Sequence, residues 1–424
     1  MRAHMLAPLT AVLVGVTIVV SACAPPQHPL GERTMRSTPI GSTETARPAP
    51  PSPSAPIPTP VPTLGGTQPA PPPSLPTPTP VPTLGAERWN EPKADRAIVV
   101  EVPAPSRGQD LYLVKPDGSP PIPLAHFREN VDAAQASPDG KYLALKTSPH
   151  YGVGNEDLLL LSMKDRRVTP IDRDTNIYSF AWAPTGDAIV YSAIPEARRL
   201  QIMLYTLGET APRVLFEWKG IGGWRVVGWD SAGEKVFLAH HIGGGLLGDE
   251  VGLLDVGTGE MERIYEDPKK RTAWVLPAPD GKGVLITRIA DIHSPEQELL
   301  LLDVTSGALT SLAKPGDPAS LLASMPLWSP DSRRLAYTVT ERAPKGTATP
   351  WQVVILDVFS NRLRVVTEVT APGILVRPLG WASDHVLVVN NLGGETLEQV
   401  VYSIRDDGTN ALRITWGRFL ATVP

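Results

Sequence analysis

The sequence predicts an all-β protein, a β-propeller of four-stranded blades, over residues 89–424. Three observations support this fold class. A tight-turn motif recurs every 46 to 53 residues, a short apolar run follows each copy, and turn residues close several of these runs. Short strands that repeat at this period are typical of propeller blades.

The turn motif has a small residue, often preceded by Trp, then Pro-Asp-Gly or a variant, and then an apolar strand. Its clearest copies are Ser137–Ala144 and Trp328–Tyr337. The small residues stand at positions 137, 183, 230, 278, 329 and 382. Because Trp recurs at one repeat position, we expect Trp182, Trp229, Trp328 and Trp381 to pack between blades. We expect the turn aspartates Asp139, Asp280 and Asp331 to cap their own backbone.

Seven polar-then-apolar runs predict the third strand of each repeat, buried on both faces. They begin at Asp110, Asp157, Gln201, Val251, Leu299, Val353 and Gln399. Only six clear turn motifs accompany them, because the first repeat, from Pro92 to Val99, has no strand before it. The chain ends with a spare apolar stretch, Phe419–Val423. We expect this last strand to complete the first blade, since closure hides sheet edges. This favours seven blades; six blades and an amino-terminal hairpin are the alternative.

These motifs resemble the WD-repeat-like propeller repeats of TolB-type proteins. The resemblance covers about Trp89–Pro424. TolB-type proteins carry an additional mixed domain before the propeller. Here only a proline-rich segment stands in that place, so the resemblance implies the fold and not the TolB role.

The first 22 residues resemble a bacterial lipoprotein signal peptide. A short positive start precedes an apolar run, Met5–Val20, which is short for a membrane span but suits a signal-peptide core. Ser21 and Ala22 then precede Cys23, the single cysteine of the chain. The resemblance implies that Cys23 carries acyl chains such as palmitate and anchors the protein to a bacterial cell membrane, facing the extracytoplasmic side. An uncleaved anchor helix is the alternative.

Residues 23–88 are predicted to form a disordered, Pro/Thr/Ser-rich linker after the lipidated cysteine. The stretch Pro56–Gly65 is nearly repeated by Leu75–Gly85. Closely spaced prolines fix φ and remove backbone donors, so a polyproline-like spacer is expected. A ligand for proline-recognising domains is the other interpretation.

The composition excludes several classes of partner and site. With 39 Lys and Arg against 44 Asp and Glu, the net charge of −5 excludes a strongly basic nucleic-acid-binding surface. One cysteine excludes an internal disulfide and any site built from several thiolates. We therefore expect no nucleic acid, and a protein or peptide of the cell envelope as partner.

Candidate binding residues lie in the predicted loops between the second and third strands, because long loops on a rigid scaffold usually carry function. They are His150, Tyr151, His240, His241, Asp291, His293, Glu341, Arg342, Asn390 and Asn391. These residues are scattered and show no metal-ligand spacing, so neither a metal nor a cofactor is expected.

Asp172–Asn176 begins like a calcium loop but has Ile177 where the glycine should be, so an inter-blade loop is predicted.

No G-x-S-x-G or H-E-x-x-H motif is present in the sequence. The sequence therefore favours a membrane-anchored binding or scaffold module of the cell envelope. The alternative is an extracytoplasmic propeller enzyme, a lyase, lactonase or glycan-acting hydrolase, that uses polar residues of the same loops. A third hypothesis is an envelope-assembly factor that docks partner peptides at the mouth of the ring.

Overall fold

The structure is a computed structural model. It describes residues 95–104, 108–149, 156–196, 199–241, 248–267, 271–289, 296–340, 351–369, 375–392 and 399–424. The predicted signal peptide, Cys23 and the predicted proline-rich linker lie outside the described residues. No helix in the described part of the chain is long and apolar enough to cross a membrane.

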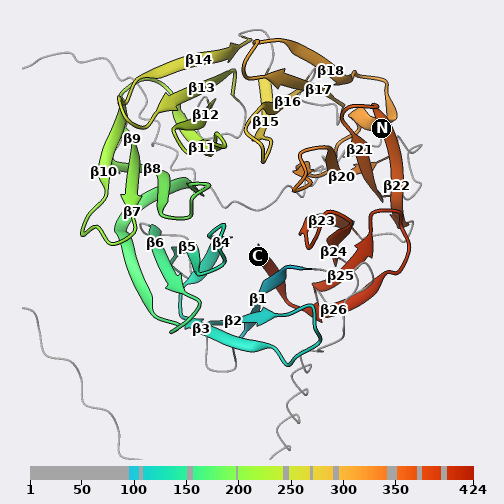
Figure 1. Cartoon of the computed structure of the whole chain (residues 1–424), viewed down its shortest axis with the longest axis horizontal. Coiled ribbons are helices and arrows are strands. Elements are labelled where there is room, and N and C mark those ends of the chain that lie inside the picture. Colours follow the sequence, from blue (N-terminus) through green and yellow to red (C-terminus); the bar gives the residue numbers. More distant parts are fainter. Residues whose placement is uncertain are drawn as a thin grey trace, which may run out of the picture. The chain divides into compact units, whose positions relative to one another are not determined.

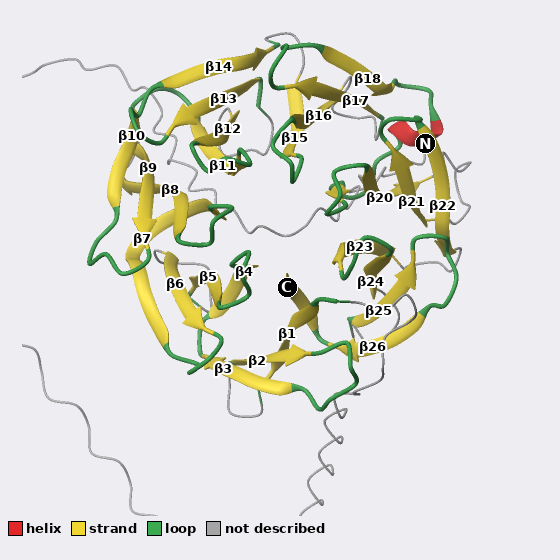
Figure 2. Ribbon diagram, in the orientation of Figure 1, coloured by secondary structure: helices red, strands yellow, loops and turns green. Residues whose placement is uncertain are grey.

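The described residues form a β-propeller of four-stranded antiparallel blades around a central opening (Figures 1 and 2). Five separate sheets have four strands each, and a sixth sheet has seven. The one helical segment in the described ranges is a short 3₁₀ turn, η1 (Pro318–Ser320). The all-β prediction is confirmed.

Each sheet runs outward from the central opening. The innermost strands are β27 (Arg418–Val423), β4 (Asn130–Ala136), the second half of β7 (Val168–Trp182), β11 (Gly223–Trp229), β15 (Arg271–Pro277), β19 (Leu327–Trp328) and β23 (Leu375–Trp381). The second strands are β1 (Ala97–Pro103), β5 (Tyr142–Ser148), β8 (Ala188–Glu196), β12 (Lys235–His241), β16 (Gly283–Ile289), β20 (Arg334–Thr340) and β24 (Val386–Leu392).

The outer half of each sheet completes the blade. The third strands are β2 (Gln109–Val114), β6 (Glu156–Ser162), β9 (Arg199–Thr206), β13 (Glu250–Asp255), β17 (Gln297–Asp303), β21 (Trp351–Asp357) and β25 (Val400–Arg405). The outermost strands are β3 (Ile122–Phe127), the first half of β7, β10 (Arg213–Trp218), β14 (Met261–Glu266), β18 (Leu309–Ala313), β22 (Arg362–Val369) and β26 (Leu412–Trp416). The predicted third-strand runs are therefore found where the sequence places them.

The last strand of the chain closes the ring, as predicted. β27 pairs antiparallel with β1, with Ala97 opposite Val423 and Glu101 opposite Arg418. The first sheet therefore combines strands from both ends of the propeller. This pairing covers an edge of β1 that would otherwise present unpaired backbone groups.

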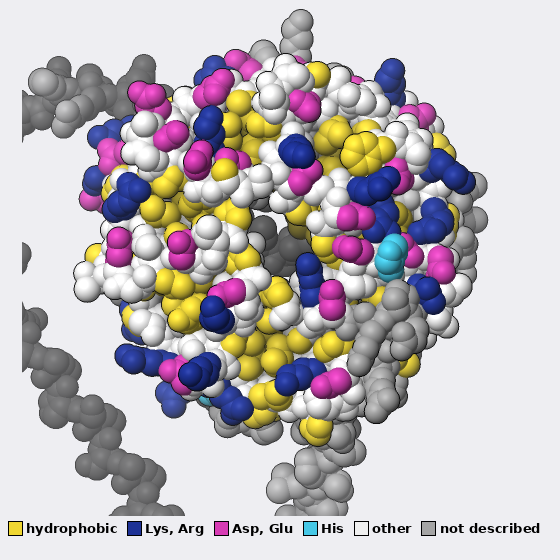
Figure 3. Space-filling view, viewed as in Figure 1, with side chains coloured by type: hydrophobic (Ala, Val, Ile, Leu, Met, Phe, Trp, Pro, Cys, Tyr) yellow, Lys and Arg dark blue, Asp and Glu magenta, His cyan; other side chains and the backbone are white. Residues whose placement is uncertain are grey.

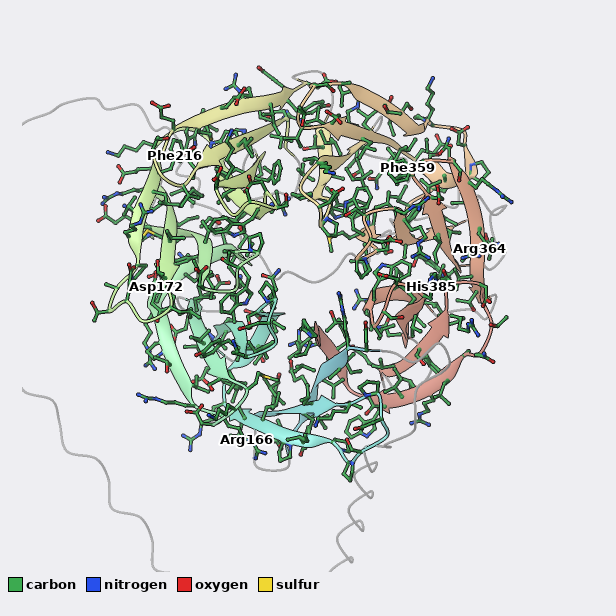
Figure 4. The ribbon with its side chains drawn as sticks, viewed as in Figure 1. Arg166, Asp172, Phe216, Phe359, Arg364 and His385 are labelled. Atoms are coloured by element: carbon green, nitrogen blue, oxygen red, sulfur yellow. The ribbon has the colours of Figure 1, made fainter. Side chains whose placement is uncertain are left out.

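β7 joins two halves of the seven-stranded sheet without a break. Up to Thr175 it pairs with β6, and from Asn176 onward with β8. The predicted inter-blade loop at Asp172–Asn176 is therefore wrong, because the outer strand of one half continues directly as the inner strand of the next. The Asp172 carboxylate (labelled in Figure 4) accepts hydrogen bonds of 2.8 Å from the hydroxyls of Thr175 and Tyr191.

The repeated turn is stabilised by its own side chains, as predicted. In the first copy the Ser137 hydroxyl donates to Asp139 Oδ1 (2.7 Å), which also accepts from the backbone N–H of Lys141 (3.1 Å). Asp280 and Asp331 accept equivalent backbone hydrogen bonds two residues downstream. These aspartates therefore have a structural role.

The recurring tryptophans link neighbouring blades, which confirms their predicted packing role. The indole Nε1–H of Trp182 donates to the Gln135 carbonyl oxygen (2.9 Å), and that of Trp328 to the Leu276 carbonyl oxygen (2.9 Å). Trp229 and Trp381 make the same kind of bond, to Ala181 (3.1 Å) and Leu327 (3.5 Å). Each bond joins the innermost strand of one blade to that of the preceding blade.

Candidate functional site

Six of the ten predicted binding residues lie outside the described residues. They are His150, Tyr151, Asp291, His293, Glu341 and Arg342. Their assignment stays a prediction.

The other four lie in strands and not in loops. His240 and His241 end β12, and Asn390 and Asn391 lie near the end of β24. The loop placement was wrong because these second strands pair with their neighbours as far as His241 and Leu392. The His241 ring stacks on Tyr178, with ring centroids 4.6 Å apart. The side chain of Asn391 lies outside the described residues.

Ionisable and polar residues gather where the innermost strands begin, which we call the loop end of the channel. Figure 3 shows the central opening that these strands surround, seen from one side of the ring. Five consecutive innermost strands each contribute one residue at this end, a set that we call the channel-mouth row. Its members are Arg377 (β23), Arg418 (β27), Asp132 (β4), Tyr178 (β7) and Arg225 (β11).

Two members of the row lie at β-bulges. The register shifts between Val131 and Ala133 leave Asp132 unpaired, and those between Ile177 and Ser179 leave Tyr178 unpaired. A bulge re-aims the side chain of its extra residue out of the regular pleat. Both side chains line a cavity of about 280 Å³ between β4 and β7, together with Lys146.

Lys146, in the wall of this cavity, forms an ion pair with the partly buried Glu156. The Lys146 ammonium is 2.8 Å from the Glu156 carboxylate and donates a 2.9 Å hydrogen bond to the Ile177 carbonyl oxygen. Burial raises the pKa of the Glu156 carboxyl, and the nearby negative charge of Asp132 raises it further. Lys146 opposes these effects. The cavity thus has in its wall a cation whose carboxylate partner has a raised pKa.

Arg225 lies beside this cavity with no acidic partner among the residues that the structure describes. Its Nε is buried and makes no hydrogen bond, and burial lowers the pKa of its guanidinium. The nearest group with which it interacts electrostatically is Tyr178, whose own pKa burial raises. A desolvated guanidinium beside a phenol is a site where an anion would be stabilised.

The opposite end of the row contains a second cationic group. Arg418 donates two hydrogen bonds to Glu101 Oε2, one of them from Nε at 3.0 Å, and one to the Val131 carbonyl oxygen. Burial raises the pKa of Glu101, and Arg418 opposes this effect. Arg377 interacts with Arg418 as a like charge. Arg418 therefore holds the Glu101 carboxylate, and Arg377 lies beside this pair without a carboxylate of its own in the described ranges.

A polar position recurs inside the apolar second strands, and this recurrence was not predicted from the sequence. The fifth residue of every second strand except β12 is polar, namely Glu101, Lys146, Ser192, Thr287, Thr338 and Asn390. All six are buried. Thr338 donates a 2.8 Å hydrogen bond to the Val376 carbonyl oxygen of the next blade, as Lys146 does to Ile177. A single polar residue that recurs in an apolar run was the available signal.

A separate cluster surrounds His240 at the base of the connection between β12 and β13. His240, Asp249 and Glu250 offer ligand atoms that lie within 4.8 Å of one another. His240 Nδ1 is 3.0 Å from Asp249 Oδ1, and its Nε2 is 3.2 Å from the Ile221 carbonyl oxygen. Arg263 pairs with Glu250 at 2.8 Å, and Arg271 is 3.8 Å from Asp249. Because these cations already balance the carboxylates, the residues fit an ion-pair network better than a metal centre.

Comparison with protein-family models finds no match, and comparison with curated proteins finds none either. Among solved structures, one of two prolyl endopeptidases aligns with a TM-score of 0.58 and 14% identity, over 73% of this chain and 46% of that chain. An oligogalacturonate lyase in complex with manganese aligns with a TM-score of 0.51 and 14% identity, over 76% of this chain and 86% of that chain. TolB from Acinetobacter baumannii aligns with a TM-score of 0.46 and 16% identity, over 77% of this chain and 82% of that chain. At these identities the likeness shows the fold alone.

Proposed function

We propose that this chain is an extracytoplasmic binding module of the cell envelope, a seven-bladed propeller held at a membrane by lipidated Cys23 and a proline-rich linker. The count of seven treats the seven-stranded sheet as two blades that meet at β7. The six-blade alternative would have to count that sheet once.

The observation that carries the binding function is the channel-mouth row. Charged side chains are rarely buried unless they are paired or functional. Here Arg225 and Arg377 are partly buried, and neither has a carboxylate partner in the described ranges. A ring whose only task was structural would be more stable with apolar residues at these two positions. We therefore infer that the loop end of the channel receives a ligand.

Photo-crosslinking in intact cells tests the position of this site. Tyr178 is replaced by p-benzoylphenylalanine in one variant, and Phe359, an exposed residue of the turn after β21 (Figure 4), in a matched control. We expect covalent adducts from position 178 and none from position 359. Adducts only from position 359, or from neither, would refute a partner-binding site at the loop end.

The second candidate function is a metal-dependent lyase. It is favoured by the structural likeness to an oligogalacturonate lyase in complex with manganese. A metal ion at His240, Asp249 and Glu250 would have to displace Arg263 and Arg271 from the two carboxylates. The test is elemental analysis of the purified chain after incubation with Mn²⁺, together with an assay for unsaturated products from oligogalacturonate. The lyase function would replace the binding function if the unmodified chain binds one equivalent of metal and forms the unsaturated product, and if His240→Ala loses the metal.

A further inference from the structure

Two neighbouring residues with buried, unpartnered polar atoms, Arg377 and Asn390, lie in the sheet next to the one that β27 closes. Arg377 on β23 and Asn390 on β24 stand directly opposite each other in an antiparallel pair, so their side chains project from the same side of the sheet. Val386, Val388 and Asn390 occupy every second position of β24 and so project from the same face of the sheet, on which the two valines pack in one apolar cluster with Ile98 of β1. By this alternation Asn390 and Arg377 face the sheet that β27 closes.

The Asn390 amide is buried without a hydrogen-bond partner in the described part of the chain. The residue is 1% exposed, and neither Oδ1 nor Nδ2 makes a hydrogen bond. At the equivalent positions Lys146 and Thr338 reach a backbone carbonyl of the next blade. Native proteins almost always satisfy buried amides. The unmet hydrogen bonds are therefore a particular property of this junction and not of the repeat.

Arg377 at the same junction also lacks a partner for its buried Nε. Arg377 Nε is buried without an acceptor, and no ion pair joins its guanidinium to a carboxylate of the described residues. Its charged neighbour is Arg418, whose donors are directed at Glu101 and the Val131 carbonyl. Arg418 is thus paired with Glu101, whereas Arg377 has no carboxylate partner in the described ranges. Guanidinium groups bind carboxylates and phosphates through paired N–H donors, and an amide N–H can add a third bond.

We propose that this junction binds the oxyanion group of a ligand, a carboxylate or a phosphate, through Arg377, Asn390 and Arg418. The proposal rests on the binding function proposed above and names the chemical class of its ligand. The ligand enters from the loop end of the channel. Arg377 supplies the charge, the Asn390 amide N–H donates to an oxygen of the anion, and Arg418 supplies the second positive charge.

Isothermal titration calorimetry on the full-length chain in detergent tests the site. Inorganic phosphate and succinate are titrated separately at constant ionic strength, and the probe that binds identifies the source of the oxyanion. We expect one equivalent to bind and Arg377→Met to raise Kd at least tenfold. The control is Arg364→Gln on β22, because Arg364 is an exposed arginine (Figure 4) whose Nη2 is 3.7 Å from Asp406. Absence of binding with both probes, or equal loss in the control, would overturn the proposal.

Asn390→Asp provides a second test that does not remove a buried cation. It places a carboxylate of the same size opposite Arg377, so we expect a higher melting temperature and loss of anion binding. An unchanged Kd with a lower melting temperature would contradict the proposal. If neither probe binds while position 178 still forms adducts, the oxyanion site is wrong and the binding function stands.

Discussion

The carboxyl group of Asp139 in the first repeated turn contributes to the acid sensitivity of the propeller. Hydrogen bonds from Lys141 and Ser137 lower the pKa of Asp139 from 3.8 to about 2. A lowered carboxyl pKa stabilises the folded state above the unfolded value, and this contribution is lost as the pH falls through the folded value. Asp139 should therefore stabilise its turn at neutral pH and lose this effect between about pH 4 and pH 2.

The measurement for Asp139 is the urea midpoint as a function of pH. Asp139→Asn should lower the midpoint at pH 7, and the difference from the unmodified protein should vanish near pH 2. Lys164→Gln, on the exposed turn after β6, is a control with the opposite charge change. A difference that persists at pH 2 would show that the charge of Asp139 is not responsible.

Lys146 balances a carboxyl that burial already disfavours in its charged form. Lys146→Met leaves Glu156 ionised and largely buried at pH 7, which should cost about 3 kcal/mol in the free energy of unfolding. The folded pKa of Glu156, already raised, should rise further. Since neutral Glu156 needs no cation, the loss should shrink as the pH falls through that pKa.

Chemical denaturation between pH 7 and pH 5 measures this effect. The control is the double variant Lys146→Met with Glu156→Gln, which lacks both charges and should show no such pH dependence. If the single variant loses the same stability at pH 5 as at pH 7, the Glu156 charge is not the cause.

At the residue scale, the turn aspartates and the recurring tryptophans could be predicted because each performs a local task that repeats with the motif. The channel-mouth row could not. Asp132, Tyr178 and Arg225 stand at one repeat position, before the small residue of the turn motif, but they share no residue type, and the orientation of two of them depends on bulges that the sequence does not predict. Asn390 was predicted as a binding residue in a loop, whereas it lies in strand β24.

At the element scale, the indole hydrogen bonds hold successive innermost strands together. Trp328→Phe keeps most of the apolar contact but leaves the Leu276 carbonyl without its donor, which should cost about 1–3 kcal/mol. Trp274→Phe is a matched control, because the Trp274 indole makes no hydrogen bond to the described residues. Equal losses of unfolding free energy in the two variants would assign the effect to packing.

β27 should be essential for a soluble ring. Deletion of residues 418–424 leaves β1 with one open edge and removes Arg418 from Glu101, so we expect aggregation or loss of cooperative thermal unfolding. Deletion of Pro424 alone, which lies beyond β27, is the control. A monomeric, cooperatively unfolding truncated protein by size-exclusion chromatography and circular dichroism would contradict this prediction.

Strand order could be predicted at this scale, but strand ends could not. The apolar stretch Phe419–Val423 follows the last complete repeat, so pairing with the first sheet was the arrangement that would bury it. In contrast, nothing in Asp172–Asn176 distinguishes a polar loop from a polar strand, and β7 continues there because pairing with β6 and then β8 satisfies its backbone.

At the scale of the whole molecule, the lipid anchor is the proposal most directly open to experiment. Cys23→Ala removes the proposed acylation site, so the protein should move from the membrane fraction to the soluble fraction. Cys23→Ser, which also lacks the thiol, should behave in the same way. A variant that still sediments with membranes would exclude the acyl chains as the anchor.

The shared sheet of β27 and β1 has a mechanical consequence for a tethered protein. The residues before position 95 lead directly into β1, which lies between β27 and β2 and is paired with both. A pull along the leader would have to slide β1 past two neighbours at once, shearing all of its ladder bonds together instead of peeling them one by one. The strand that the proposed tether would load is thus held on both of its edges.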